Sequence, residues 1–99
     1  MNFTKPLPNT FTLYCKSGCI NCTKAKDVLS QCNYKFQIID CDAYLTDDVV
    51  KAAFLQFIKN LASKEHKTFP IIFHDGEFVG GYTDLHQYLD RLLDFSESF

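Results

Sequence analysis

Five cysteines lie in the first half of the chain, and two of them, Cys19 and Cys22, form a C-x-x-C pair. This spacing serves two kinds of chemistry, dithiol redox exchange and metal binding. Redox exchange needs a nucleophilic thiolate with a second thiol within its reach. Metal binding needs three or four ligands held in a fixed geometry. The strands and helices predicted around the pair indicate whether redox exchange or metal binding is expected.

The residues around the pair predict a β-α-β unit. Residues 11–15 (FTLYC) are a short run of β-formers, which ends at the polar loop Lys16-Ser17-Gly18. Residues 36–40 (FQIID) predict a second strand, and two strands joined by one helix form a parallel pair with a right-handed crossover. Between them, side chains of low polarity recur at helical spacing, at Cys19, Cys22, Ala25, Val28, Leu29 and Cys32. The pair therefore stands where a strand leads into a helix.

The second half of the sequence predicts a helix, a hairpin and a final helix. Thr46 is expected to cap the first of these, whose buried face comprises Val50, Ala53, Phe54, Phe57, Ile58 and Leu61. Residues 70–73 and 78–79 are predicted strands, because the Asp75-Gly76 turn between them accepts the positive φ angles of a tight hairpin. The final helix begins near Tyr82 or Thr83 and buries Leu85, Tyr88, Leu89 and Leu92.

The order of these elements, β-α-β-α-β-β-α, demands a four-stranded mixed sheet flanked by helices, an α/β arrangement of the thioredoxin-like kind. Residues 1–9 carry two prolines and are expected to form an extended lead-in. The chain has no internal repeat, low-complexity tract or second boundary. Residues 1–99 are therefore predicted to form a single domain.

The start of a helix favours negative charge on Cys19. Free N–H groups and the helix dipole stabilise an anion there, so we expect Cys19 to be the ionised, nucleophilic thiol. Cys22 lies one turn later on the buried stripe and is expected to be the shielded, resolving thiol. Cys15 and Cys32 are expected in the core, whereas Cys41 follows a strand and is packed or exposed.

The cysteines have two other interpretations. Ordinary buried cysteines are common in protein cores, but Cys19 follows a glycine loop and precedes the buried stripe. Zinc or iron would draw on Cys15, Cys19 and Cys22, with further ligands from His66, His74 and His86. No second C-x-x-C or H-x-x-x-H accompanies them. We therefore expect no metal site.

Composition argues against several other classes of protein. A chain of 99 residues that is 46% hydrophobic supplies one core. A net charge of −2 gives no basic stripe for nucleic acid. No segment approaches the roughly 18 apolar residues of a membrane span, and the N-terminus lacks the pattern of a secretory signal. We expect a cytoplasmic protein whose cysteines are thiols.

Three segments resemble the glutaredoxins, in the same order and with similar spacings: residues 16–22 (KSGCINC), 68–70 (TFP) and 80–84 (GGYTD). The resemblance covers residues 10–94, and the second cysteine is typical of the dithiol class. It implies a glutathione-dependent thiol-disulfide oxidoreductase, in which Cys19 attacks a disulfide and Cys22 resolves the mixed disulfide. It also implies a monomer. The implied partners are glutathione and disulfide-bonded or glutathionylated proteins, with ribonucleotide reductase among them.

The resemblance also implies a glutathione groove beside the reactive cysteine. Lys16 is similar to the family lysine that meets a glutathione carboxylate. Pro70 is similar to the family's cis-proline, which turns the backbone of Phe69 toward an extended substrate. Thr83 and Asp84 open the last helix, and the resemblance implies that its free N–H groups hold the γ-glutamyl carboxylate while Asp84 takes the amino group. The other positions carried over from the family are Gln56, Thr68 and Gly81.

The chain departs from the family pattern between its cysteines. Ile20 and Asn21 stand where Pro and Tyr are usual, which restores an N–H at the first helical position and removes a ring. Phe69 replaces the usual valine. Two alternatives stay open: a protein that holds a [2Fe-2S] cluster between two protomers with Cys19 and glutathione, and a thioredoxin-like protein served by a dedicated reductase.

Overall fold

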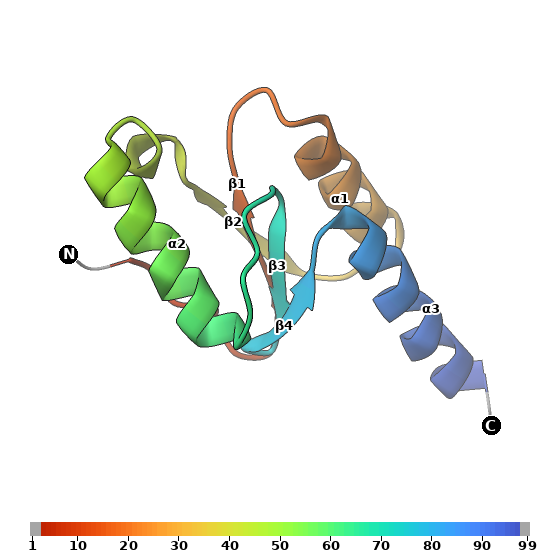
Figure 1. Cartoon of the computed structure of the whole chain (residues 1–99). Coiled ribbons are helices and arrows are strands. Elements are labelled where there is room, and N and C mark those ends of the chain that lie inside the picture. Colours follow the sequence, from red (N-terminus) through yellow and green to blue (C-terminus); the bar gives the residue numbers. More distant parts are fainter. Residues whose placement is uncertain (1–2, 98–99) are drawn as a thin grey trace.

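The computed structural model describes residues 3–97, and the side chains of residues 3–92. Its elements follow the predicted order, and none of the described helices is long and apolar enough to cross a membrane (Figure 1). The strands are β1 (Phe11–Cys15), β2 (Phe36–Asp40), β3 (Ile71–His74) and β4 (Glu77–Gly80). The helices are α1 (Ile20–Gln31), the short 3-10 turn η1 (Asp42–Tyr44), α2 (Asp48–Ala62) and α3 (Tyr82–Glu97).

The four strands form one mixed sheet in the order β2-β1-β3-β4. β1 pairs with β2 in parallel and with β3 antiparallel, and β3 and β4 form the predicted hairpin. Asp75 and Gly76 have φ angles of 51° and 79°, which are the positive values that a tight hairpin turn requires. β3 begins at Ile71, one residue later than predicted, because Pro70 has no N–H to donate to the ladder.

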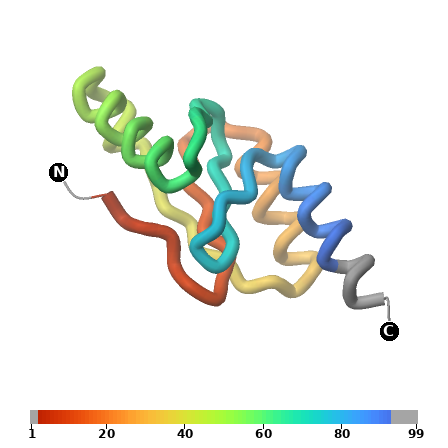
Figure 2. Tube along the Cα trace, turned by 60° about the horizontal axis from the view of Figure 1, so that its bottom comes forward, coloured from red at the N-terminus to blue at the C-terminus, as the bar shows by residue number. Residues whose placement is uncertain are grey.

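The helices cover both faces of the sheet. α1 and α3 run beside each other on one face, whereas α2 lies on the other (Figures 1 and 2). β1 serves both layers because its side chains alternate: Phe11, Leu13 and Cys15 pack with α1 and α3. Tyr14 packs with α2. All five residues of β1 are buried, so the strand that leads to Cys19 is packed on both faces of the sheet.

Two predictions about α1 and α2 are wrong. Cys32 is exposed, because α1 ends at Gln31 and the buried stripe ends with Leu29. Thr46 does not cap α2, since its hydroxyl donates to the Ala43 carbonyl at 3.3 Å. The cap is Asp47, whose carboxylate accepts from the N–H groups of residues 49 and 50 at 2.7 and 3.2 Å. Aspartate is the stronger N-cap residue of the two.

The buried face of α2 is narrower than predicted. Phe54 and Ile58 are fully buried, whereas Ala53 is exposed because it faces away from the sheet. The remaining predicted members of that face, Val50, Phe57 and Leu61, are half-buried. Part of the lead-in covers this helix: the Phe3 ring packs 5.4 Å from the Phe54 ring between centroids. Phe3 is thus part of the packing on the α2 face.

The substitution Phe54→Ala is expected to destabilise the fold by about 3–5 kcal/mol. The Phe54 ring is 0% exposed and packs against the rings of Tyr44 and Phe69, so its loss leaves a cavity. Chemical denaturation followed by circular dichroism measures the free energy of unfolding. Val49→Ala is the matched control, because Val49 is 77% exposed on the same helix and its loss should cost less than about 0.5 kcal/mol. Similar losses in the two variants would contradict the packing described for Phe54.

Candidate redox site

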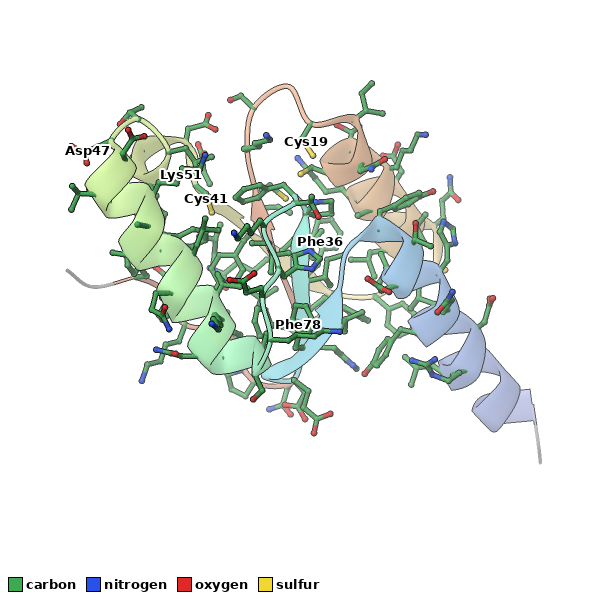
Figure 3. All side chains as sticks on the ribbon, in the orientation of Figure 1. Cys19, Phe36, Cys41, Asp47, Lys51 and Phe78 are labelled. Atoms are coloured by element: carbon green, nitrogen blue, oxygen red, sulfur yellow. The ribbon has the colours of Figure 1, made fainter. Side chains whose placement is uncertain are left out.

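Cys19 occupies the N-cap of α1, at the end of the loop that follows β1 (Figure 3). Gly18 has a φ angle of 68°, which turns the chain into the cap. The half-buried Cys19 Sγ accepts a hydrogen bond from the Cys22 N–H at 3.1 Å. A sulfur therefore takes the position that a capping hydroxyl usually holds. The start of a helix, with its free N–H groups, is a position that suits an anion in general.

Cys22 lies one turn further along α1 and is 1% exposed. Burial raises the pKa of its thiol well above the ordinary value, and the hydrogen bond with Cys19 raises it further. The residues between the two cysteines, Ile20 and Asn21, are both exposed, Ile20 by 71%. The pair thus consists of an accessible thiol at the helix end and a buried, protonated thiol beneath it.

The loop before β3 meets Cys19 from the other side. The Cys19 thiol donates to the carbonyl oxygen of Phe69 at 3.6 Å, and the Phe69–Pro70 peptide bond is cis. The Lys16 ammonium group lies 5.6 Å from the centroid of the Phe69 ring, within the range of a cation–π contact. Thr68 is exposed directly before Phe69. The Phe69 carbonyl and Lys16 therefore lie beside Cys19.

The N-terminus of α3 lies next to the loop before β3. The Gly81 N–H donates to the Asp84 carboxylate at 2.9 Å, so Asp84 holds the start of α3. Helix α3 begins at Tyr82, which places Thr83 inside its first turn rather than at the cap. A Cβ atom at Gly81 would lie 3.8 Å from the Pro70 carbonyl oxygen. The start of α3 thus packs against the loop that contacts Cys19.

Gln56 lies on α2, beside a cavity whose lining does not include Cys19. Its side-chain amide donates to the side-chain oxygen Oδ1 of Asn60 at 2.9 Å on the exposed side of α2. It lines a cavity of about 220 Å³ with His66 and Lys67, among other residues. Cys19 lines a different cavity of about 350 Å³ between the loop after β1 and α1. The role of Gln56 in binding glutathione stays a prediction.

Sequence reasoning missed the residue that fixes the loop before Cys19. The Ser17 N–H donates to one oxygen of Asp42 at 2.8 Å, and the Ser17 hydroxyl donates to the other oxygen. These hydrogen bonds lower the pKa of the Asp42 carboxyl group. Cys15 pairs with Asp40 in the parallel register, so the residues two positions beyond each strand end lie opposite each other. The parallel β1–β2 pair was the signal that would have predicted this tether.

The substitution Asp42→Ala is expected to loosen the loop that carries Lys16 and Ser17. Removing both acceptors leaves the Ser17 N–H to solvent, so its hydrogen exchange should accelerate. Alkylation of Cys19 should slow, because the loop then holds the sulfur less often at the helix end. Amide exchange measured by NMR and mass-detected alkylation test this. Asp27→Ala on the exposed side of α1 is the control, and equal exchange at Ser17 in both variants would contradict the tether.

The histidines considered as metal ligands lie against aromatic rings. His74 stacks on Phe11 at 4.1 Å between centroids, and its Nδ1 lies 2.5 Å from the Tyr88 hydroxyl. His66 packs on Phe78, and His86 packs on Tyr82. Within residues 3–92, no three His, Cys, Asp or Glu side chains come together as a metal site.

Comparison with known proteins identifies the family. Residues 11–79 match the family model described as glutaredoxin. The chain belongs to the glutaredoxin family. It is 33% identical over 85 residues to a protein named probable glutaredoxin from Acanthamoeba polyphaga mimivirus, which covers 84% of this chain and 80% of that protein. It is 29% identical over 87 residues to glutaredoxin 1 of Escherichia coli, covering 83% of this chain and 94% of that protein.

Solved glutaredoxin structures share the fold. Glutaredoxin 1 from Francisella tularensis superimposes with a TM-score of 0.72 at 26% identity, covering 86% of this chain and 96% of that one. A buckwheat glutaredoxin–glutathione complex superimposes with a TM-score of 0.62 at 25% identity, covering 83% and 70%. These structures confirm the predicted thioredoxin-like fold. As a glutaredoxin, the chain is a thiol-disulfide oxidoreductase.

Proposed function

We propose that this glutaredoxin uses glutathione to reduce protein disulfides and glutathione mixed disulfides through Cys19 and Cys22. The observation that carries the proposal is the Cys22 N–H directed at the accessible Cys19 Sγ at 3.1 Å, where a helix end favours the thiolate. Glutathione bound to the buckwheat relative supports glutathione as co-substrate. On family grounds, ribonucleotide reductase and glutathionylated proteins are the proposed protein substrates, and the cytoplasm is the proposed location.

The proposed reaction runs through Cys19 first. Its thiolate attacks one sulfur of the target disulfide, forms a mixed disulfide and releases the other sulfur as a thiolate. Two exits follow. A glutathione thiolate attacks the adduct and regenerates Cys19, or Cys22 loses its proton and displaces the adduct, which leaves a Cys19–Cys22 disulfide. Glutathione then reduces that internal disulfide in two exchanges.

The groove for glutathione is proposed to run from Cys19 to the start of α3. Lys16 lines the cavity beside Cys19 and offers a positive charge to a carboxylate. The backbone of Phe69, beside the reactive sulfur, offers hydrogen bonds to an extended peptide. The free N–H groups at the start of α3, near Thr83, suit the γ-glutamyl carboxylate, and Asp84 suits its amino group. These charges match the two ends of the tripeptide.

The choice of reductant tests the proposed function. Glutathione with glutathione reductase should sustain reduction of the mixed disulfide between glutathione and a small thiol. Thioredoxin reductase with NADPH should not reduce the oxidised chain, and consumption of NADPH in both systems is followed by absorbance. Turnover with thioredoxin reductase alone would instead support the thioredoxin-like alternative.

The substitution Asp84→Asn is expected to raise the KM for glutathione about tenfold with little change in kcat. It removes the charge that faces the amino group, and a hydrogen bond to a charged group is worth about 1.5 kcal/mol or more, which corresponds to about tenfold. The amide still accepts from the Gly81 N–H, so the start of α3 should persist. Asp90→Asn removes an exposed charge from the same helix and is the control. An unchanged KM in Asp84→Asn would place the amino group elsewhere.

The iron-sulfur alternative stays a prediction. Cys15 and Cys22 are 4% and 1% exposed, so the accessible thiol that this site offers to a shared cluster is that of Cys19. A [2Fe-2S] cluster takes four thiolates, which here requires a second copy of the chain and two glutathione molecules. Visible absorbance of anaerobically purified protein tests it. A colourless protein that is active with glutathione would contradict the cluster.

A further inference from the structure

A third thiol lies directly behind the redox pair. Cys15 is the last residue of β1 and is 4% exposed, in the same buried cluster as Cys22. The side chains of Cys15 and Cys22 pack in this cluster and influence each other's pKa. Cys22 therefore has two thiol neighbours, the accessible Cys19 and the buried Cys15. Two thiols packed in one buried cluster meet the first requirement for forming a disulfide, which is proximity.

Cys15 also lines a cavity that differs from the one beside Cys19. It lines a cavity of about 220 Å³ together with Lys16, Ser17, Lys26, Ile38 and Asp40. The cavity beside Cys19 and Cys22 shares Lys16, Ser17 and Lys26 with it. Burial raises the pKa of the Cys15 thiol, whereas its hydrogen bond with Cys22 and the charge of Lys26 act in the opposite direction. The charge of Lys26 thus favours the Cys15 thiolate, and the cavity gives its proton a path to solvent.

We propose that Cys15 is a second resolving thiol, which takes the internal disulfide over from Cys19 and stores it as a buried Cys15–Cys22 disulfide. The inference rests on the proposed function, because the disulfide reaches Cys22 through Cys19. Cys15 loses its proton and attacks the Cys22 sulfur, so that the Cys15–Cys22 bond forms and the Cys19–Cys22 bond breaks. Cys19 leaves as a thiolate. No electrons enter or leave, because one disulfide replaces another.

This exchange changes what the oxidised chain does. With Cys22 bound to Cys15, the accessible Cys19 is again free of a disulfide. It continues to exchange with glutathione mixed disulfides, but Cys22 no longer resolves its adducts. The chain thus acts through one thiol for as long as the buried disulfide persists.

Tryptic peptide mapping distinguishes the two disulfides, because Lys16 separates Cys15 from Cys19 and Lys24 follows Cys22. The full chain with Cys32→Ser, which removes an exposed thiol, is oxidised with glutathione disulfide, then alkylated and digested at successive times. A Cys19–Cys22 disulfide stays within peptide 17–24. A Cys15–Cys22 disulfide joins peptide 17–24 to the peptide that ends at Lys16, with Cys19 alkylated. We expect the joined peptides to accumulate after the internal disulfide.

Two variants in the same background sharpen the test. Cys15→Ser should keep the disulfide within peptide 17–24 and lose the joined peptides. Cys41→Ser is the matched control and should leave the pattern unchanged, since Cys41 is a buried thiol on the α2 side whose pKa is raised to about 12. In the Cys32→Ser chain, a disulfide confined to peptide 17–24 at all times would overturn the inference and leave the proposed function intact. No glutathione adduct or disulfide at Cys19 would overturn both.

Discussion

Replacing Cys19 with serine is expected to reduce the glutathione-dependent reduction of a small mixed disulfide to the rate measured without protein. A serine hydroxyl accepts the Cys22 N–H as well as the sulfur does, so α1 should still begin at residue 20. The hydroxyl is not ionised at neutral pH and does not exchange with disulfides, so the first step has no nucleophile. Oxidation of NADPH by coupled glutathione reductase measures the rate.

The control for this loss is Cys32→Ser, which removes an exposed thiol at the other end of α1. It should keep the full rate, and thermal unfolding should show that both variants remain folded. Measurable glutathione-dependent turnover in Cys19→Ser would mean that another thiol starts the reaction.

Replacing Cys22 with serine is expected to separate two activities. Reduction of glutathione mixed disulfides should be substantially retained, because a second glutathione resolves the Cys19 adduct without help from residue 22. Reduction of protein disulfides should stall, because the adduct between Cys19 and the protein is resolved by the buried thiol. The stalled adduct should appear as a covalent complex on a non-reducing gel.

The buried position of residue 22 requires a control for packing. Cys41→Ser places the same hydroxyl at another fully buried thiol, and it should retain both activities if folded. Parallel loss of both activities in Cys22→Ser, with the fold intact, would contradict the division of roles between the two cysteines.

The strand and helix pattern was predictable because local signals agree with the tertiary structure. β1 and β2 were predicted to the residue, since turn-forming or polar residues limit each run of β-formers. The N-terminal position of Cys19 on α1 followed from the glycine loop before it and the apolar stripe after it. Where two signals competed, prediction failed: Thr46 and Asp47 both suit an N-cap, and only the course of the chain selects Asp47.

The contacts within the site were less predictable because they depend on how elements are placed against each other. Cys15 was expected in the core, but its contact with Cys22 depends on the rotation of α1 over β1. The sequence likewise placed Gln56 on the second helix without showing that it faces a different cavity from Cys19. The Ser17–Asp42 tether was within reach, since it follows from the parallel pairing of two strands that were both predicted.

The two residues between the cysteines can be substituted with little loss of fold stability, because their side chains are exposed. Ile20 is 71% exposed and Asn21 is exposed, so neither holds the sheet or the helices together. In contrast, every residue of β1 is buried, and this strand holds the loop that leads to Cys19 in place. A library of variants at these two positions should therefore yield mostly well-folded members, which differ in the surface that surrounds Cys19.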